Sequence, residues 1–327
     1  MPFANPLASS LFAMSRVPHH TAVGTPTSPR RSRRPAASTA AYMAKVSDFV
    51  EPYATNARSG SRMEICHCRR IIRFGGLPRT GSGILVDMDS LFADEAFDRR
   101  PKIVAPGAVW VPGFLTDEAQ QWIIARYADW QSGPVPPHAT TIAGHPMSVT
   151  TIGLGWHWQP GRYDRRAVDV NDKVVLPFPD WMTRLGRQVL QSAAAVLEDA
   201  PDLAPGTAAA WGFDPAGYHP DVALVNYYDE HAKMGMHQDK DEFDPAPVVS
   251  LSLGDTCLFR FGNTETRNRP FEDLRLASGD AFVFGGPARF AYHGVRSIQP
   301  GTAPDAGRLK HLGGGRINIT MRTTGRD

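Results

Sequence analysis

The feature that most constrains the fold of this chain is a series of short, β-like apolar runs between residues 222 and 323. Turn-forming pairs such as Gly254-Asp255 and Gly279-Asp280 separate the runs. The runs cover residues 222–228, 248–253, 256–261, 281–284 and 316–323. Many short strands with regular turns are typical of a β-sandwich or a β-barrel.

Two predicted helices precede these strands. Thr116 is a suitable N-cap for the first, and Asp117 and Glu118 match the positive end of its dipole. The second spans residues 180–198. Apolar residues at helical spacing mark the buried faces: Ala119, Trp122, Ile123, Tyr127 and Trp130 in the first helix, and Leu185, Val189, Ala193, Val196 and Leu197 in the second. We therefore predict an α+β fold, mainly β, in which N-terminal helices buttress one face of the strand-rich core.

The charge of the chain is unevenly distributed. The formal net charge is +2, but residues 1–87 hold 12 basic and 4 acidic side chains, so residues 88–327 carry a net charge of −6. Residues 1–87 also lack apolar periodicity, whereas Met88 opens the first segment that has a fold-like pattern. We divide the chain into a basic N-terminal extension, residues 1–87, and a folded domain, residues 88–327.

Three interpretations of the extension fit its composition. The first is a basic tail that touches nucleic acid, and the second is an Arg- and Ser-rich organellar transit peptide. The third is an unstructured extension, which includes the case of a start codon assigned too far upstream. A Ser/Thr/Pro/Arg-rich stretch at residues 22–41 cannot bury enough apolar surface to offset the entropy of ordering it. We therefore expect residues 1–87 to be disordered.

The composition excludes two classes of protein. No run approaches the roughly 18 apolar residues of a membrane-spanning helix. Three cysteines cannot form a disulfide framework, which indicates a reducing compartment. We expect a monomer that has no membrane partner and works in the bacterial cytoplasm, although the basic extension leaves an organellar or nuclear location open.

A His-x-Asp motif supplies candidate metal ligands. Residues i and i+2 of an extended strand point to the same side, so His237 and Asp239 converge on one point. Two histidines and one carboxylate are the ligand set of non-haem Fe(II) oxygenases. His293 is the best candidate for the second histidine, but spacing alone leaves other histidines open, namely His219, His231 and His311.

The last predicted strand alternates strictly. Its apolar positions form one face, and Arg316, Asn318, Thr320 and Arg322 form the other. Such polar residues usually face water, but arginine is also the residue that binds carboxylates through two parallel hydrogen bonds. Two arginines six residues apart are separated by about 20 Å of backbone, a gap that two side chains and one dicarboxylate fill. This strand therefore predicts a clamp for a dianion.

These motifs together resemble the AlkB-type, Fe(II)- and 2-oxoglutarate-dependent DNA alkylation-repair dioxygenases. The resemblance covers nearly all of residues 88–327 and begins at the MDSLFADE segment of residues 88–95. The matching motifs are Asn-x-Tyr at 226–228, His-Gln-Asp-Lys-Asp-Glu at 237–242, Tyr-His-Gly at 292–294 and Arg-x-Asn-x-x-x-Arg at 316–322. The implied fold is a double-stranded β-helix, or jelly roll, with N-terminal helices and a nucleotide-recognition lid.

The resemblance also implies a role for each matching residue. His237, Asp239 and His293 bind iron and carry out catalysis with O2. The residues implied in 2-oxoglutarate binding are Asn226, Tyr227, Tyr228, Arg316, Asn318 and Arg322. The residues implied in substrate binding are Trp156 and Tyr163 in the lid, Asp241 at the base edge and Arg267 on the strand.

The implied activity is oxidative demethylation of N1-methyladenine and N3-methylcytosine in DNA, preferably single-stranded, with release of succinate, CO2 and formaldehyde. Both lesions are cations, which an aromatic face and a carboxylate bind more strongly than the neutral base. Because the domain is acidic, we expect a local strip of Arg162, Lys240 and Arg267 to meet the phosphates. The alternative is a 2-oxoglutarate oxygenase that acts on methylated RNA or on a substrate other than nucleic acid. Thr151 stands where the bacterial family members carry Met, which leaves base packing there open.

Overall fold

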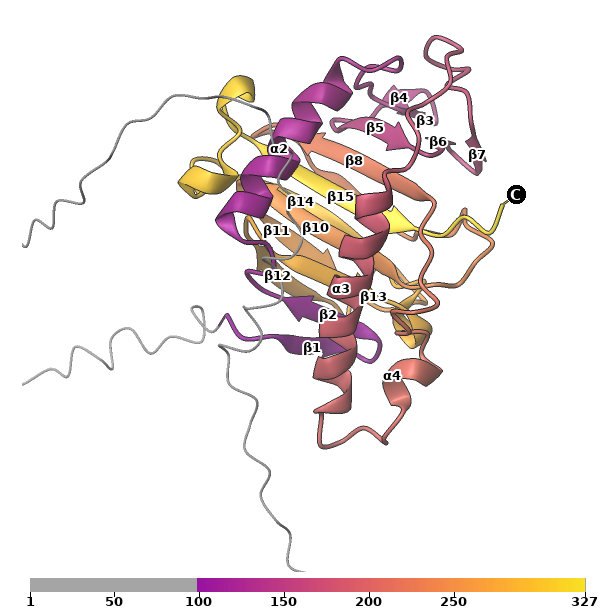
Figure 1. Cartoon of the computed structure of the whole chain (residues 1–327), viewed down its shortest axis with the longest axis vertical. Coiled ribbons are helices and arrows are strands. Elements are labelled where there is room, and N and C mark those ends of the chain that lie inside the picture. Colours follow the sequence, from indigo (N-terminus) through magenta and orange to yellow (C-terminus); the bar gives the residue numbers. More distant parts are fainter. Residues whose placement is uncertain (1–98, 327) are drawn as a thin grey trace, which may run out of the picture. The chain divides into compact units, whose positions relative to one another are not determined.

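The computed structural model describes residues 99–326, which form two facing antiparallel β-sheets with helices (Figure 1). The predictions for residues 1–87 and for the segment at 88–95 lie outside the described residues. The large sheet has the order β1 (Lys102–Ala105), β2 (Ala108–Val111), β13 (Ala281–Phe284), β10 (Val248–Gly254), β15 (Arg316–Arg322), β8 (Val222–Tyr228), β5 (Thr150–Leu154). The small sheet has the order β12 (Glu272–Leu276), β11 (Thr256–Phe261), β14 (His293–Gln299), β9 (Met234–His237).

Two short hairpins extend from the β5 end of the large sheet. They are β3 (Thr141–Ile142) with β4 (His145–Pro146), and β6 (His157–Gln159) with β7 (Arg162–Asp164). The helices are α2 (Asp117–Gln131), α3 (Asp180–Glu198) and α4 (Thr207–Ala210), and short 3-10 turns lie at Gly286–Ala288, Asp305–Gly307 and Lys310–Leu312. Within residues 99–326, none of the helices has both the length and the hydropathy needed to cross a bilayer.

A phenylalanine-rich core fills the space between the sheets. Phe259 and Phe261 of β11 face Phe282 and Phe284 of β13, with ring centroids 5.1 Å apart for the 259–282 pair and 5.7 Å apart for the 261–284 pair. The alternation of strand side chains sends these rings inward from both sheets. This two-sheet core fits the predicted jelly roll, and it holds rigid the strands that carry the polar residues of the site.

The helices cover the opposite face of the large sheet (Figure 1). Thr116 caps α2 by accepting from the backbone N–H of Ala119 at 3.3 Å, as the sequence predicted. Helix α3 has the predicted bounds and contacts β1, β2, β10 and β13. Its buried stripe matches the prediction except at Val196, which is half-buried. The stripe is apolar because α3 packs on the apolar outer face of the large sheet. The polar side chains of β8 and β15 point to the other face, into the interior between the two sheets.

Candidate active site

His237 and His293 lie opposite each other on neighbouring strands. His237 ends β9 and His293 begins β14, and the two are cross-strand partners with ring centroids 4.5 Å apart. Cross-strand partners share a face of the sheet, so both imidazoles reach the same side.

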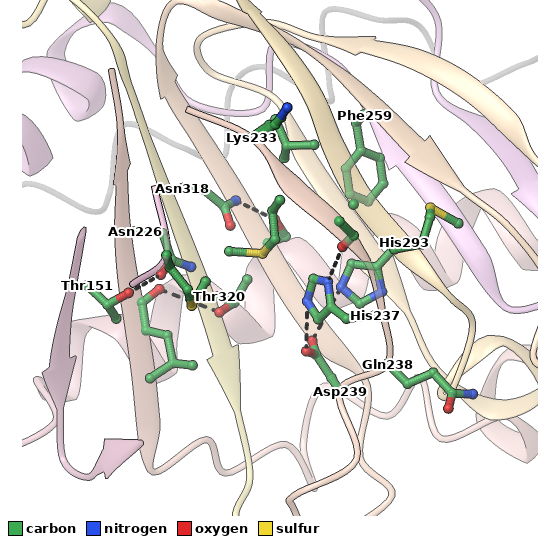
Figure 2. A pocket seen from close by; sticks show the side chains of 18 of the residues that line it. Thr151, Asn226, Lys233, His237, Gln238, Asp239, Phe259, His293, Asn318 and Thr320 are labelled. Carbon is green, nitrogen blue, oxygen red and sulfur yellow. Dashed lines mark hydrogen bonds and ion pairs between the residues drawn. The ribbon is translucent and has the colours of Figure 1, made fainter. Parts of the chain in front are cut away.

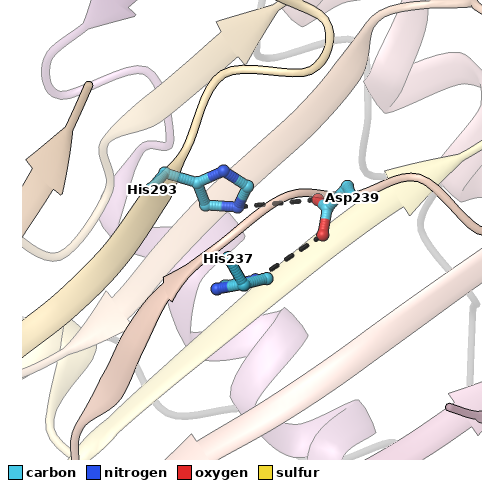
Figure 3. A group of neighbouring side chains, drawn as sticks. All are labelled: His237, Asp239 and His293. Atoms are coloured by element: carbon cyan, nitrogen blue, oxygen red, sulfur yellow. Dashed lines mark ion pairs between the residues drawn. The ribbon is translucent and has the colours of Figure 1, made fainter. Parts of the chain in front are cut away.

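Asp239 completes the group that the sequence predicted (Figure 3). It follows the end of β9, and its carboxylate oxygens lie 3.6 Å from Nε2 of His237 and 3.6 Å from Nε2 of His293. One ligand atom from each residue falls within 4.8 Å of the others. The three other histidines considered for this role lie elsewhere: His219 contacts Arg187, His231 is exposed, and His311 packs near Tyr127.

Backbone carbonyls orient both imidazoles. Nδ1 of His237 is 3.0 Å from the carbonyl of Gly235, and Nδ1 of His293 is 3.0 Å from the carbonyl of Ala291. A carbonyl can only accept, so Nδ1 carries the proton in each ring and the lone pair of Nε2 faces Asp239. This is the orientation that a metal ligand needs.

The charges around the triad favour the ionisation states that bind a metal. Burial alone raises the pKa of Asp239, but Arg322 and the two histidines outweigh it and lower that pKa to about 2. Burial, reinforced by His237, lowers the pKa of His293 to about 4. The site therefore presents an ionised carboxylate and a neutral imidazole at neutral pH, as Fe(II) requires.

The polar face of β15 lines the same cavity as the triad. This cavity has a volume of about 410 Å³, and Arg316, Asn318, Thr320 and Arg322 all contribute to its wall. Figure 2 shows Asn318 and Thr320 on the same cavity as the triad. The usual expectation that such residues face water does not hold here, since every residue of β15 is buried. The sequence prediction of a polar, ligand-facing strand is supported by this placement.

Arg316 is a buried cation with unused donors. Its side chain is 1% exposed, and its Nη2 donates to Ser252 Oγ at 2.9 Å. Within residues 99–326, Nε and Nη1 of Arg316 have no hydrogen-bond partner. A buried guanidinium with two unpaired donors is costly unless an anion meets it, and a carboxylate is the anion whose shape fits. The free donors of Arg316 are thus suited to bind the distal carboxylate of 2-oxoglutarate.

Arg322 lies at the other end of β15, beside the triad. Its Nη2 is 2.8 Å from Oδ2 of Asp239, and its Nη1 donates to Oε1 of Glu242 at 3.0 Å. In the described part of the chain its buried Nε lacks a hydrogen-bond partner. The two arginines therefore bracket the cavity as the predicted clamp requires. Glu242 was missed as a site residue because a single acid in an acid-rich loop carries no signal of its own.

Three further residues that were predicted to hold 2-oxoglutarate also reach the cavity. Asn226 and Tyr228 of β8 line it together with Asn318, whose Nδ2 donates to Ser250 Oγ at 2.7 Å. Tyr227 does not line it, so its predicted role is corrected. Alternation along β8 turns Tyr227 to the opposite face, where its ring stacks on Tyr127 of α2 with centroids 6.4 Å apart.

Thr151, the residue that departs from the family pattern, supports Asn226. Thr151 on β5 pairs with Asn226 on β8, and its Oγ1 donates to Asn226 Oδ1 at 2.8 Å. This bond fixes which end of the Asn226 amide faces the cavity. The Thr that stands in place of the family's Met therefore places a hydroxyl donor in the cavity wall beside Asn226.

We expect Thr151→Val to weaken binding of 2-oxoglutarate. The change keeps the shape of the side chain but removes the donor to Asn226, and such a bond contributes about 0.5–1.5 kcal/mol. The KM for 2-oxoglutarate is expected to rise about 2- to 10-fold, and Thr151→Ser is expected to restore it. Steady-state succinate assays measure both values. An unchanged KM in the Val variant would show that Asn226 does not depend on this bond.

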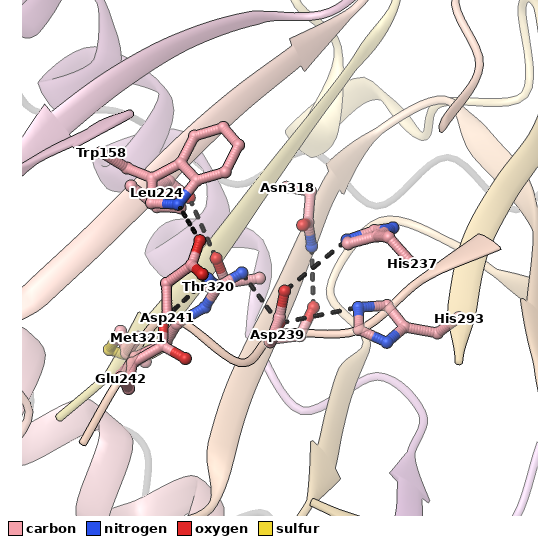
Figure 4. Close-up of polar contacts among 12 residues, drawn as sticks. Trp158, Leu224, His237, Asp239, Asp241, Glu242, His293, Asn318, Thr320 and Met321 are labelled. Carbon is pink, nitrogen blue, oxygen red and sulfur yellow. Dashed lines mark hydrogen bonds and ion pairs between the residues drawn. The ribbon is translucent and has the colours of Figure 1, made fainter. Parts of the chain in front are cut away.

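The predicted substrate residues divide into two groups. Asp241 and Arg267 line the cavity. Trp156 and Tyr163 do not, because they are 6% and 5% exposed and pack into a separate cluster with Val222 and Leu224. A third aromatic residue of the same segment, Trp158, lines the cavity instead and donates from Nε1 to Asp241 Oδ2 at 2.8 Å (Figure 4).

The basic strip predicted for phosphates is present in part. Lys240 and Arg267 are exposed at the cavity wall, and Lys233 joins them there. Arg162 is exposed on β7 and donates from Nε to Gln159 at 2.9 Å, outside the cavity wall. The basic side chains are thus confined to a small area beside the cavity, whereas the domain as a whole is acidic.

Arg289 anchors the loop that follows the triad. It is 2% exposed, and its guanidinium donates to the carbonyls of Asp239 at 2.7 Å and Ala246 at 2.9 Å and to Glu242 Oε2 at 3.1 Å. Sequence reasoning missed Arg289 because its partners lie far away in the chain. Its three bonds fix the backbone on which Asp239 is carried.

We expect Arg289→Met to destabilise the protein by about 3–5 kcal/mol, because the change leaves Glu242 with one buried cation fewer. It is also expected to weaken metal binding, since the Asp239 backbone loses its anchor. Arg260→Met is the matched control, because Arg260 pairs with Asp273 near the surface of the small sheet at 2.6 Å and such pairs contribute at most about 1 kcal/mol. Urea unfolding and metal titration test both variants, and equal effects of the two would contradict the anchoring role.

Comparison with known proteins agrees with this geometry. The model of the 2OG-Fe(II) oxygenase superfamily matches residues 107–322. The chain is similar to the alpha-ketoglutarate-dependent dioxygenase AlkB homolog of Caulobacter vibrioides, with 40% identity over 227 residues, which cover 68% of this chain and 90% of the relative. It is 30% identical over 250 residues to the DNA N(6)-methyladenine demethylase ALKBH1D of Arabidopsis thaliana, covering 72% of this chain and 54% of the relative.

A solved structure of a related protein has a similar fold. The structure of OsALKBH1 matches with a TM-score of 0.58 and 30% identity, covering 68% of this chain and all of that one. The match over residues 107–322 includes the triad, the arginines of β15 and every strand of both sheets except β1. The chain therefore belongs to the 2OG-Fe(II) oxygenase superfamily, as an AlkB-type dioxygenase that uses Fe(II), 2-oxoglutarate and O2.

Proposed function

We propose that this protein is an oxidative demethylase of alkylated bases in DNA, with N1-methyladenine and N3-methylcytosine in single strands as its substrates. Its family provides the oxygenase chemistry, and the name of the Arabidopsis relative provides a precedent for a methylated base in DNA. We also propose that it acts as a monomer. The similarity to a bacterial AlkB homolog supports work in the bacterial cytoplasm.

One observation carries the proposal. A single cavity of about 410 Å³ contains the triad, the unpaired donors of Arg316 and, beyond them, the carboxylate of Asp241. The co-substrate lies between Arg316 and Arg322, so the part of the wall formed by Trp158 and Asp241 is left for a second molecule. A carboxylate beside an indole favours a planar cation over the neutral base.

Each assigned side chain has a positioning role. His237, Asp239 and His293 hold the metal, and the donors of Arg316 and Arg322 orient the two carboxylates of 2-oxoglutarate. Bound iron supplies the chemistry that oxidises an N-methyl group with O2 while 2-oxoglutarate is converted to succinate and CO2. The hydroxymethyl group formed on the ring nitrogen then leaves as formaldehyde. The apolar wall, which includes Phe259 and Leu224, excludes water from the reacting atoms.

We assign the lid to residues 141–164, which comprise β3 to β7. Residues Ile142, Met147, Ser148, Thr151 and Trp158 of this segment line the cavity. A base reaches such a site only if it leaves the helical stack, which costs least when the base is damaged or already in a single strand. This supports the preference for single-stranded substrates.

Succinate release in the presence of different nucleic acids tests the proposal. We expect release to rise with single-stranded DNA that carries N1-methyladenine or N3-methylcytosine, and to stay at background with unmethylated DNA. Methylated RNA and DNA that carries N6-methyladenine are the comparison substrates, because they represent the alternative of an RNA oxygenase and the activity named for ALKBH1D. If only methylated RNA or only DNA with N6-methyladenine stimulates succinate release, that nucleic acid is the substrate and the proposal is wrong. If none of the nucleic acids stimulates release, the substrate is not a nucleic acid.

A further inference from the structure

Three aromatic side chains in residues 156–163 form one cluster, but they are not equivalent. Trp156 and Tyr163 are buried, whereas Trp158 on β6 is half-buried and lines the cavity. Trp158 and Tyr163 are cross-strand partners on the β6–β7 hairpin. Tyr163 therefore supports Trp158 from the neighbouring strand.

Trp156 is already fully engaged. Its Nε1 donates to Asp221 Oδ2 at 2.9 Å, and the guanidinium of Arg165 lies 3.6 Å from the centroid of its ring. Asp221 in turn accepts from the backbone N–H of Thr324 at 2.7 Å. A base could stack on Trp156 only after Arg165 had left the ring, so this residue has a structural role.

Tyr163 is engaged as well. Its hydroxyl donates to Glu242 and accepts from Nη1 of Arg322 at 3.2 Å. Burial strongly raises its pKa, so it remains a neutral donor to Glu242. Tyr163 thus ties the hairpin to the β15 arginine, and its ring is closed to a ligand.

Trp158 and Asp241 form one recognition unit at the cavity wall (Figure 4). Asp241 Oδ2 accepts from Trp158 Nε1 at 2.8 Å and from the backbone N–H of Gly161 at 3.3 Å. Both bonds use the same oxygen, and neither uses Oδ1. The hairpin therefore fixes the carboxylate and the indole relative to each other.

We propose that Trp158 is the ring on which the substrate base stacks, and that its indole N–H holds Asp241 in place to meet the positive edge of that base. This inference rests on the proposed function, and it assigns to Trp158 the role that the family resemblance implied for Trp156. Tryptophan is the strongest cation–π partner among the aromatic side chains, so the unit selects alkylated bases that carry a charge.

Three variants of the full-length protein test the assignment: Trp158→Leu, Trp158→Phe and Trp156→Phe. The substrate is a single-stranded oligonucleotide with one N3-methylcytosine, assayed with Fe(II) and 2-oxoglutarate. Loss of the ring in Trp158→Leu is expected to raise KM about 10- to 100-fold, with a smaller change in kcat, because stacking of a base on an aromatic ring is worth about 1–3 kcal/mol. Trp158→Phe keeps a ring but loses the bond to Asp241, so its KM is expected to rise only about 2- to 10-fold.

Fluorescence gives a readout that a purely structural role would not change. An anaerobic titration with the same oligonucleotide is expected to quench tryptophan emission in the wild-type protein and in Trp156→Phe, and to lose most of that quenching in Trp158→Phe. Unchanged quenching in Trp158→Phe, or an unchanged KM in Trp158→Leu, overturns the assignment. A wild-type protein that binds the oligonucleotide without demethylating it contradicts the proposed function instead, and the titration still decides which ring is stacked.

Discussion

Replacement of His237 by alanine is expected to abolish demethylation and succinate release together. The change removes one of the two imidazoles in the triad, and no other described residue joins this group as a ligand within 4.8 Å. The remaining histidine and carboxylate form an incomplete set for Fe(II). Metal content after dialysis and succinate release in the presence of excess Fe(II) measure the two consequences. The loss is expected to persist at saturating 2-oxoglutarate.

His231→Ala is the control for this variant. His231 lies six residues away, its side chain is 86% exposed, and it pairs only with the neighbouring Glu230. We expect this variant to retain wild-type metal content and turnover. Wild-type turnover in His237→Ala would refute the assignment of the triad, because no other group in residues 99–326 brings three such ligands together.

Replacement of Arg316 by methionine is expected to raise the KM for 2-oxoglutarate by about 30-fold or more. Methionine fills a similar volume but removes the charge and the two unpaired donors, and loss of one partner from a buried, hydrogen-bonded charge pair costs about 2–5 kcal/mol. Metal content is expected to remain near that of the wild-type protein, because Arg316 does not contact the triad. Removing an unpaired buried cation is also expected to leave stability unchanged or increased.

Arg308→Met is the control for Arg316→Met. Arg308 is 52% exposed and pairs with Asp305 at the surface, so its loss is expected to change neither KM nor stability measurably. A normal KM for 2-oxoglutarate in Arg316→Met would show that the distal carboxylate binds elsewhere. Loss of metal together with the rise in KM would show instead that Arg316 supports the whole site.

The strands that carry the clamp were predictable because their patterns are strict. The alternation from Arg316 to Arg322 and the apolar run at 222–228 match β15 and β8 closely. Strand β14 was not predicted, and the extended strand assumed for His237 and Asp239 ends at His237, so that Asp239 lies just beyond β9. Residues 234–237 and 293–299 form short, glycine-containing segments without strict alternation, so their strand conformation comes from pairing with each other and with β11 rather than from local propensity.

The triad itself was predictable from the resemblance, whereas the surroundings of the substrate were not. The spacing from Trp156 to Tyr163 indicated a segment that reaches the cavity, but it could not show which ring faces the cavity. That choice depends on contacts distant in sequence, such as the bond from Trp156 to Asp221 and the stacking of Arg165. The same holds for Arg289, whose three acceptors are separated from it by more than 40 residues.

The central claim is that one cavity couples oxidation of 2-oxoglutarate to removal of a methyl group from a nucleic acid base. Mass spectrometry of a single-stranded oligonucleotide with one N1-methyladenine or N3-methylcytosine, incubated with the protein, Fe(II), 2-oxoglutarate and O2, tests it most directly. The account predicts conversion to the unmethylated oligonucleotide, with one succinate and one formaldehyde formed for each methyl group lost, and no conversion with His237→Ala. Succinate formed while every methyl group stays on the oligonucleotide would contradict it.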